Sequence, residues 1–169
     1  MKRNILARSN TFKSIRNSMD SLSFLELDTP TLTKSTPEGA KDFLVPSRKQ
    51  SGSFYALPQS PQMYKQLFMI SGFNKYYQIA KCYRDEDSRK DRQPEFTQLD
   101  LEILNGTPDE VRKTTETIVK ELLDNVFSIK VDVPFRDMTY KEAIENFGTD
   151  KPDLRLSLIH ISEPTRLTR

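Results

Sequence analysis

Residues 83–102, with the sequence YRDEDSRKDRQPEFTQLDLE, decide the fold of this chain. Two β-rich runs, residues 76–84 and 95–104, flank a segment in which residues 85–93 are all polar. This pattern predicts two long strands joined by a polar loop. Because side chains alternate between the faces of a strand, Leu99, Leu101 and Ile103 are expected on a core face.

The opposite face of the second strand is the first candidate site. It carries an aromatic ring, an amide and two carboxylates, from Phe96, Gln98, Asp100 and Glu102. A solvated outer face is the simpler interpretation of such a row. The loop before it, however, mixes acids with the basic residues Arg84, Arg89, Lys90 and Arg92. Guanidinium groups bind phosphates, and carboxylates bind an ammonium group or a metal ion, so the set suits a polyanionic ligand.

Around this pair of strands the sequence predicts helices and a hairpin. Helical spacing of Ile5, Phe12, Ile15 and Met19 predicts an amphipathic helix at the N-terminus, while the basic residues before Asp20 would also suit a mitochondrial transit peptide. A short strand over residues 23–27 follows and stops at Pro30.

Residues 42–45 and 54–57 read as a hairpin that turns at Ser51 and Gly52. A helix is expected from an N-cap at Ser60 to a stop at Gly72. Capping boxes at Thr107 and Thr139 predict a long helix and a short one, the latter ending at Gly148. The fold class is therefore α+β, an antiparallel sheet flanked by helices.

Composition limits the possible functions. A chain of 169 residues suits one domain, and the net charge of +2 creates no overall field that commits it to nucleic acid. The single cysteine, Cys82, forms no internal disulfide and is read as a small strand residue in a reducing compartment. No apolar run approaches the roughly 20 residues of a membrane span, so no membrane partner is predicted.

The quoted stretch resembles motif 2 of class II aminoacyl-tRNA synthetases, in the form found in the aspartyl type. Residues 24–48, FLELDTPTLTKSTPEGAKDFLVPSR, resemble motif 1 and the aspartate loop after it. Residues 54–87 resemble the approach to motif 2, and NFGTDKPDLR at 146–155 resembles the bacterial pattern before an inserted domain. The resemblance spans residues 2–155 and implies a partial catalytic domain of that fold.

The resemblance implies an aspartate–tRNA ligase of the bacterial and mitochondrial type. Its substrates would be ATP with Mg²⁺, L-aspartate and tRNA(Asp), and aspartyl-adenylate its intermediate. Arg84 would be catalytic, holding the α-phosphate and the attacking carboxylate together. With Arg84, the residues Glu86, Gln93 and Phe96 would bind ATP, Phe96 by stacking on adenine. Glu102 is a candidate metal ligand.

The same resemblance implies an amino-acid pocket and two contact surfaces. Lys65 would pair with the side-chain carboxylate of aspartate and reject asparagine, which would leave the ammonium unpaired. The other pocket residues would be Glu38, Ser60, Gln62, Gln98 and Asp100. Arg89, Lys90 and Arg92 would face the tRNA acceptor stem, although a solvated loop explains them equally well. Pro30 would lie at a homodimer interface formed by motif 1.

Some family features have no counterpart in the sequence. Motif 3, the second arginine of the aspartate pocket, a histidine-bearing loop and the anticodon-binding domain are missing, so residues 1–155 alone are not expected to make adenylate efficiently. Residues 156–169, LSLIHISEPTRLTR, resemble translated sequencing-adapter DNA rather than this family. A divergent natural C-terminus is the alternative.

Two other functions remain open. One is an asparaginyl-type synthetase or a related asparagine synthetase, against which the segments TPEGA and QSPQMYKQ favour the aspartyl type. The other is a non-catalytic binding or dimerisation module. The expected compartment is the mitochondrial matrix if the source is eukaryotic, which the adapter-like tail favours, and the cytoplasm if it is bacterial.

Overall fold

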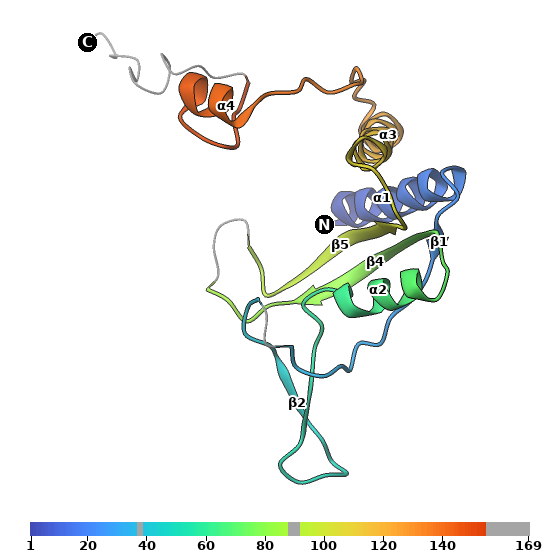
Figure 1. Cartoon of the computed structure of the whole chain (residues 1–169), viewed down its shortest axis with the longest axis vertical. Coiled ribbons are helices and arrows are strands. Elements are labelled where there is room, and N and C mark those ends of the chain that lie inside the picture. The colour runs from blue at the N-terminus through green and yellow to red at the C-terminus, as the bar shows by residue number, and fades with distance from the viewer. Residues whose placement is uncertain (37–38, 88–91, 155–169) are drawn as a thin grey trace, which may run out of the picture. The chain divides into compact units, whose positions relative to one another are not determined.

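A computed structural model describes residues 1–36, 39–87 and 92–154 (Figure 1). The chain divides into two compact units, residues 1–133 and 134–169. The first unit contains every candidate site residue. The tail from residue 155 onwards, which includes the adapter-like sequence, lies outside the described residues.

A sheet forms the centre of the first unit. Strands β4 (Lys75–Tyr83) and β5 (Glu95–Ile103) pair antiparallel along their whole length, which confirms the two predicted strands. The short β1 (Leu25–Glu26) adds to the other edge of β4 and runs parallel to it. The sheet is therefore mixed, whereas an antiparallel one was expected. A parallel pair needs a long crossover, and the chain between β1 and β4 supplies it.

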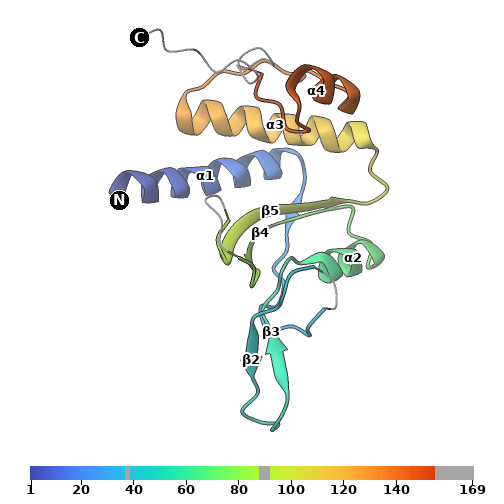
Figure 2. The ribbon, with the colours of Figure 1, turned by 90° about the vertical axis from the view of Figure 1, so that its left-hand side faces the viewer.

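Helices α1 (Lys2–Ser21) and α3 (Pro108–Phe127) lie side by side over one face of this sheet (Figure 2). The buried core between them and the sheet contains Ile15, Met19, Phe24, Tyr77 and Ile118. Leu99, Leu101 and Ile103 pack against this cluster, so the predicted core face of β5 is confirmed. The α+β class is confirmed as well.

The first helix confirms the amphipathic prediction only in its second half. Ile15 and Met19 are buried, whereas Ile5 is exposed. Arg16 then ties α1 to the sheet edge, because its guanidinium donates to both carboxylate oxygens of Glu26 at 2.9 Å. The Tyr77 hydroxyl also donates to Glu26, at 3.1 Å.

Helix α2 (Gln62–Ile70) covers the other face of the sheet. The ring of Phe68 lies 5.4 Å from that of Tyr76. The helix begins one residue later than expected, with Pro61 and not Ser60 at the N-cap position, and no side-chain hydrogen bond of the described residues caps it. A proline ring has no oxygen that could accept a bond from the first turn.

The predicted hairpin is confirmed as β2 (Leu44–Pro46) and β3 (Phe54–Ala56), an antiparallel pair. Thr33 joins it through two backbone hydrogen bonds of 2.9 Å with Ala56. In the second unit, α4 (Tyr140–Phe147) has the predicted reciprocal capping box between Thr139 and Glu142 and ends at Gly148 with a φ of 69°. None of the described helices is long and apolar enough to cross a membrane.

Truncating Met19 tests the core. Its side chain is 0% exposed, so Met19→Ala should lower the free energy of unfolding by about 2–5 kcal/mol through lost burial and a residual cavity. Met63→Ala is the matched control, because Met63 is 61% exposed and its truncation should cost less than about 0.5 kcal/mol. Urea unfolding measures both. Equal losses of unfolding free energy in the two variants would show that Met19 of α1 is not part of the buried core.

Candidate functional site

The site begins where β4 ends. Arg84 follows directly, and its backbone N–H donates to the Pro94 carbonyl oxygen at 2.9 Å, closing the ladder between the two strands. The guanidinium carbon of Arg84 lies 5.1 Å from the centre of the Phe96 ring, within the range of a cation–π contact. A cation and an aromatic ring thus lie together where β4 ends and β5 begins.

A cavity of about 340 Å³ opens beside them. Its lining contains all the predicted ATP-binding residues, Arg84, Glu86, Gln93 and Phe96, together with Asp87 and Arg92. Arg92, which was assigned to the acceptor-stem surface, is therefore brought to this cavity, where its Nη1 lies 3.7 Å from Glu86 Oε2. The cavity offers a ligand two cations, an aromatic ring and an amide, beside the carboxylates of Glu86 and Asp87.

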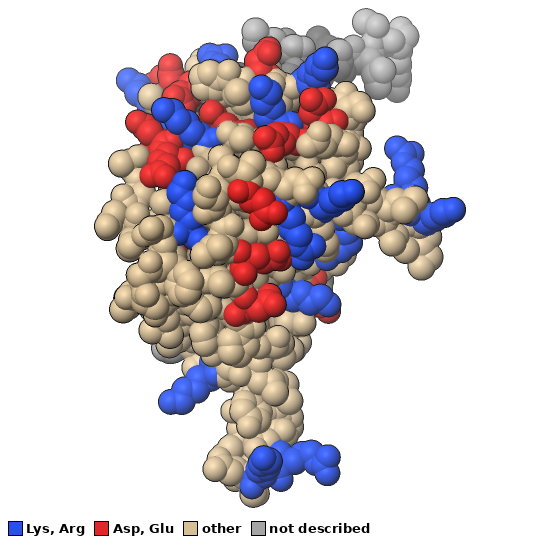
Figure 3. Space-filling model, turned by 90° about the vertical axis from the view of Figure 1, so that its right-hand side faces the viewer, with Lys and Arg blue, Asp and Glu red and all other residues tan. Residues whose placement is uncertain are grey.

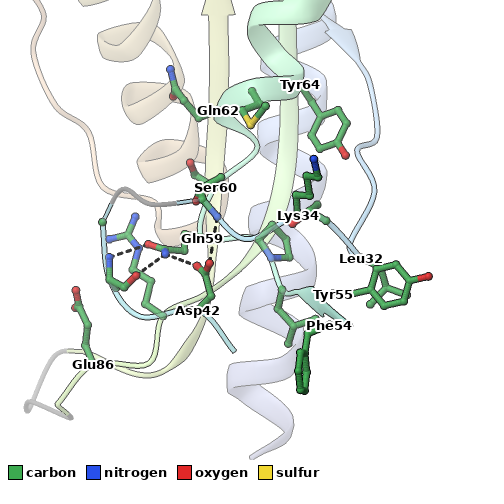
Figure 4. A pocket seen from close by; sticks show the side chains of 18 of the residues that line it. Leu32, Lys34, Asp42, Phe54, Tyr55, Gln59, Ser60, Gln62, Tyr64 and Glu86 are labelled. Carbon is green, nitrogen blue, oxygen red and sulfur yellow. Dashed lines mark hydrogen bonds between the residues drawn. The ribbon is translucent and has the colours of Figure 1, made fainter. Parts of the chain in front are cut away.

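A second cavity of about 930 Å³ lies between the hairpin, the segment after β1 and the start of α2 (Figure 4). Two predicted aspartate-binding residues, Ser60 and Gln62, line it. Arg84 and Glu86 line it as well as the smaller cavity. The two cavities therefore share one guanidinium and one carboxylate.

One wall of the larger cavity is built by the side-chain amide of Gln59. Its Oε1 accepts from the Ala40 N–H at 2.9 Å, and its Nε2 donates to the Ala40 carbonyl at 2.6 Å and to Asp42 Oδ1 (Figure 4). Asp42 Oδ2 accepts from Ser35 Oγ at 2.6 Å and from the Thr36 N–H at 3.2 Å. Burial raises the pKa of Asp42, but the bonds from Gln59, Ser35 and Thr36 outweigh it, so the net pKa is lowered and the carboxylate stays ionised.

The sequence reasoning missed Gln59, Asp42 and Gly39 as site residues. The partners of Gln59 lie 17 and 19 residues earlier in the chain, so no helical or strand periodicity marks them. Gly39 has a φ of 91°, and a Cβ there would lie 2.6 Å from Gln59 Oε1. The glycine in the segment TPEGA was the one available signal of this close approach.

A third group lies between α2 and β5. Lys65 Nζ is 3.2 Å from Asp100 Oδ1 and 3.2 Å from Glu102 Oε2. The side chains of Lys65 and Asp100 are each 12% exposed, because α2 covers this end of the strand. The interpretation of this face as solvated is therefore wrong at Asp100.

Asp100 has a buried oxygen, Oδ2, whose hydrogen-bonding capacity is unused among the described residues. Burial raises the pKa of Asp100, the nearby Lys65 opposes this, and Glu102 adds a further rise, so the net pKa is raised. A second cation or donor would satisfy the free oxygen.

The predicted pocket residues are thus only partly brought together. Ser60 and Gln62 line the larger cavity, whereas Lys65, Asp100 and Gln98 line neither cavity. Gln98 lies opposite Ala80 on the same strand face as Asp100. Pro30 is exposed in the segment after β1. Glu38, Arg89 and Lys90 lie outside the described residues.

The remaining chemistry is limited. Burial raises the pKa of the Cys82 thiol to about 11, so it stays protonated and inert, in agreement with its interpretation as a strand residue. Within residues 1–36, 39–87 and 92–154, no three His, Cys, Asp or Glu side chains converge on a metal position. Glu102 is paired with Lys65, so the described residues do not by themselves form a Mg²⁺ site.

The sequence model of the family described as tRNA synthetases class II (D, K and N) matches residues 1–167. The chain belongs to this family. The resemblance found in the motifs and the expected fold are confirmed by this match.

Two curated bacterial proteins are similar to this class II synthetase chain. The aspartate–tRNA ligase of Oceanobacillus iheyensis is 55% identical over 158 residues, which cover 92% of this chain and 27% of that protein. The aspartate–tRNA(Asp/Asn) ligase of Thermodesulfovibrio yellowstonii is 51% identical over 158 residues, 94% of this chain and 27% of that protein. The chain therefore spans about a quarter of the length of these relatives.

The raised pKa of Asp100 predicts a pH dependence of stability. A carboxyl group whose pKa is raised by folding stabilises the fold below its ordinary pKa of 3.8, and this contribution is lost as pH rises through the raised value. Asp100→Asn lacks this loss, and Lys65 keeps Glu102 as its partner. The stability of the variant relative to the wild type should therefore increase from about pH 4 to about pH 7.

The measurement is chemical unfolding across this pH range. Asp132→Asn serves as the control, because it removes the same charge from an exposed position and should leave the difference nearly constant. If the stability of Asp100→Asn relative to the wild type fell with rising pH, the effect of Lys65 on the pKa of Asp100 would outweigh that of burial.

Proposed function

We propose that this chain is part of an aspartate–tRNA ligase, which activates L-aspartate with ATP and transfers it to tRNA. The observation that carries the proposal is that Arg84 and Glu86 line both cavities. An amino acid in the larger cavity and a nucleotide in the smaller one would meet at the Arg84 guanidinium. The names of the bacterial relatives support the choice of aspartate.

The chemistry asked of Arg84 is electrostatic. An oxygen of the aspartate α-carboxylate attacks the α-phosphorus of ATP, the bond from that phosphorus to the bridging oxygen breaks, and pyrophosphate leaves. Two anions must approach each other for this to happen. A guanidinium between them offsets their repulsion, holds the reacting atoms in line and stabilises the charge that develops on the phosphoryl oxygens.

The nucleotide would use the smaller cavity. Phe96 offers a ring face to adenine, and Gln93 and Glu86 offer hydrogen-bonding groups at its rim. Arg84 already lies over one face of the Phe96 ring, so adenine would stack on the opposite face. Mg²⁺ would arrive with the ATP phosphates, which is the usual way proteins hold this ion. Glu102, the candidate ligand, would first have to leave Lys65.

The aspartate would lie beside Ser60 and Gln62 in the larger cavity. Lys65 and Asp100 line neither cavity in this structure, so they would bind its charged groups only after a rearrangement that opens the cavity toward them. Lys65 already lies between Asp100 and Glu102, so the substrate carboxylate would compete with them for one ammonium group. The unpartnered Oδ2 of Asp100 suits the substrate ammonium, together with the hydrogen-bonding groups of Ser60, Gln62 and Gln98. A substrate carboxylate could replace one of these partners of Lys65, whereas the neutral amide of asparagine could not, and this is how the site would select aspartate.

The tRNA partner is supported by local charge. Residues 43–84 contain no Asp or Glu, and the end of the hairpin carries Arg48 and Lys49. Figure 3 shows only basic charged side chains at this tip, which suits a phosphate backbone. Arg89 and Lys90, which lie outside the described residues, would add to this contact, whereas Arg92 lines the smaller cavity.

Assembly and compartment belong to the same proposal. A homodimer through the segment around Pro30 would follow the family pattern, and the exposure of Pro30 is compatible with it. The bacterial relatives favour the cytoplasmic alternative over the mitochondrial matrix that the sequence analysis preferred. One of the two relatives described above is named for tRNA(Asp) and tRNA(Asn), so tRNA(Asn) is a further candidate substrate.

Replacing Arg84 tests the reaction. In the product of the full reading frame, Arg84→Ala should lower aspartate-dependent ATP–pyrophosphate exchange by about 10²–10³-fold, because the transition-state charge loses its partner. Arg84→Lys should also be impaired, since a lysine cannot reproduce the planar fork. Lys81→Ala is the control, because this lysine is exposed, lines neither cavity and forms its ion pair with Glu95. Wild-type protein without exchange would favour a non-catalytic module, and exchange with asparagine would favour the asparaginyl type.

A further inference from the structure

The side chain of Gln59 makes more contacts than a packing role requires. Its amide bonds both the N–H and the carbonyl of Ala40, and its Nε2 also donates to Asp42. The amide thus pairs with the N–H and the C=O of one residue, as a residue on a neighbouring antiparallel strand would. Both of its polar atoms are used, and the orientation is fixed, because a reversed amide would oppose donor to donor and acceptor to acceptor.

Both segments joined by Gln59 are also tied to the residues on either side of Arg84. The Tyr83 N–H donates to the Pro58 carbonyl, and the Asp85 N–H donates to the Lys41 carbonyl, each at 2.9 Å. Pro58 precedes Gln59, and Lys41 follows Ala40. Gln59 therefore closes a ring of bonds that runs from the end of β4 through the cavity wall and back.

The wall itself leaves little room for another arrangement. Gly39, Ala40 and Asp42 line the larger cavity together with Gln59 and Ser60. A side chain at Gly39 would meet Gln59 Oε1 at 2.6 Å, and the positive φ there is strained for other residues. Asp42 fixes the other end of the segment through Ser35 and Thr36.

We propose that Gln59 is a positioning residue that holds residues 39–42 against residues 58–60, and so sets the affinity of the larger cavity for the amino-acid substrate. The proposal rests on the proposed function for the identity of that substrate. Gln59 acts through the backbone of Ala40 and through Asp42, which places its effect on aspartate rather than on ATP. The smaller cavity does not include it.

Gln59→Glu is the sharpest test, because it keeps the shape and changes one donor into an acceptor. A carboxylate oxygen would then face the Ala40 carbonyl and the Asp42 carboxylate, which is repulsive at both contacts. The KM for L-aspartate in pyrophosphate exchange should rise at least about tenfold, and the KM for ATP should change less than about twofold. Gln50→Glu, on the exposed hairpin turn, makes the same chemical change and should alter neither value.

A second measurement does not depend on activity. Hydrogen exchange of the Ala40 amide should become at least about tenfold faster in Gln59→Glu, while the Leu57 amide, which donates to Phe43, keeps its rate. Adding Asp42→Asn should recover part of both effects, because its amide can donate to the new carboxylate. Gln59→Asn, which is too short to reach both atoms of Ala40, carries the test if Gln59→Glu fails to fold.

The outcomes separate the two proposals. Unchanged exchange of the Ala40 amide in both Gln59 variants would overturn the role of Gln59, and so would faster exchange with an unchanged KM for aspartate. A wild-type protein that neither binds nor activates aspartate would instead overturn the proposed function. In that case the Ala40 amide still decides whether Gln59 holds the segment.

Discussion

The antiparallel pairing of β4 and β5 is the constraint on which the rest of the first unit depends. The register runs without a break from Lys75 opposite Ile103 to Tyr83 opposite Glu95. Strand geometry then assigns every side chain to one of two faces. On β5, one face is apolar and packs against the core under α1 and α3, and the other is polar and carries candidate site residues. A slip of one residue would exchange the two faces completely, so the core fixes the position of the site residues.

The site itself forms where this regular pairing ends. Arg84 is the first residue beyond β4, and its neighbours Tyr83 and Asp85 use their backbone N–H groups to hold Pro58 and Lys41. These main-chain hydrogen bonds therefore fix the irregular segments around the larger cavity in position relative to the sheet. This explains how loops without a core of their own can present side chains at fixed positions, with a rigid strand pair as their support.

The fold was largely predictable because its signals are local. Alternation in β5, the Thr107 cap of α3 and the Thr139 capping box of α4 all depend on residues within one element. The parallel pairing of β1 was not predictable, since its two-residue strand carries no sign of which neighbour it joins. The candidate ATP set came from the resemblance to motif 2, and the structure brings Arg84, Gln93 and Phe96 to one cavity because they flank one loop. The role of Gln59 in the cavity wall was missed because its partners, Ala40 and Asp42, are distant in the chain and Ala40 bonds through its main chain.

The polar face of β5 contributes less to the stability of the fold than a fully satisfied interior would. Asp100 is buried with one oxygen unpartnered, and Lys65 is shared between two carboxylates that repel each other. An apolar pair of similar volume would stabilise the fold at least as well, because removing charges from water costs more than a single contact returns. Such departures from a well-satisfied interior concentrate at functional sites. Under the proposed function, a zwitterionic substrate would correct this imbalance, because its ammonium would pair with Asp100 and its carboxylate with Lys65.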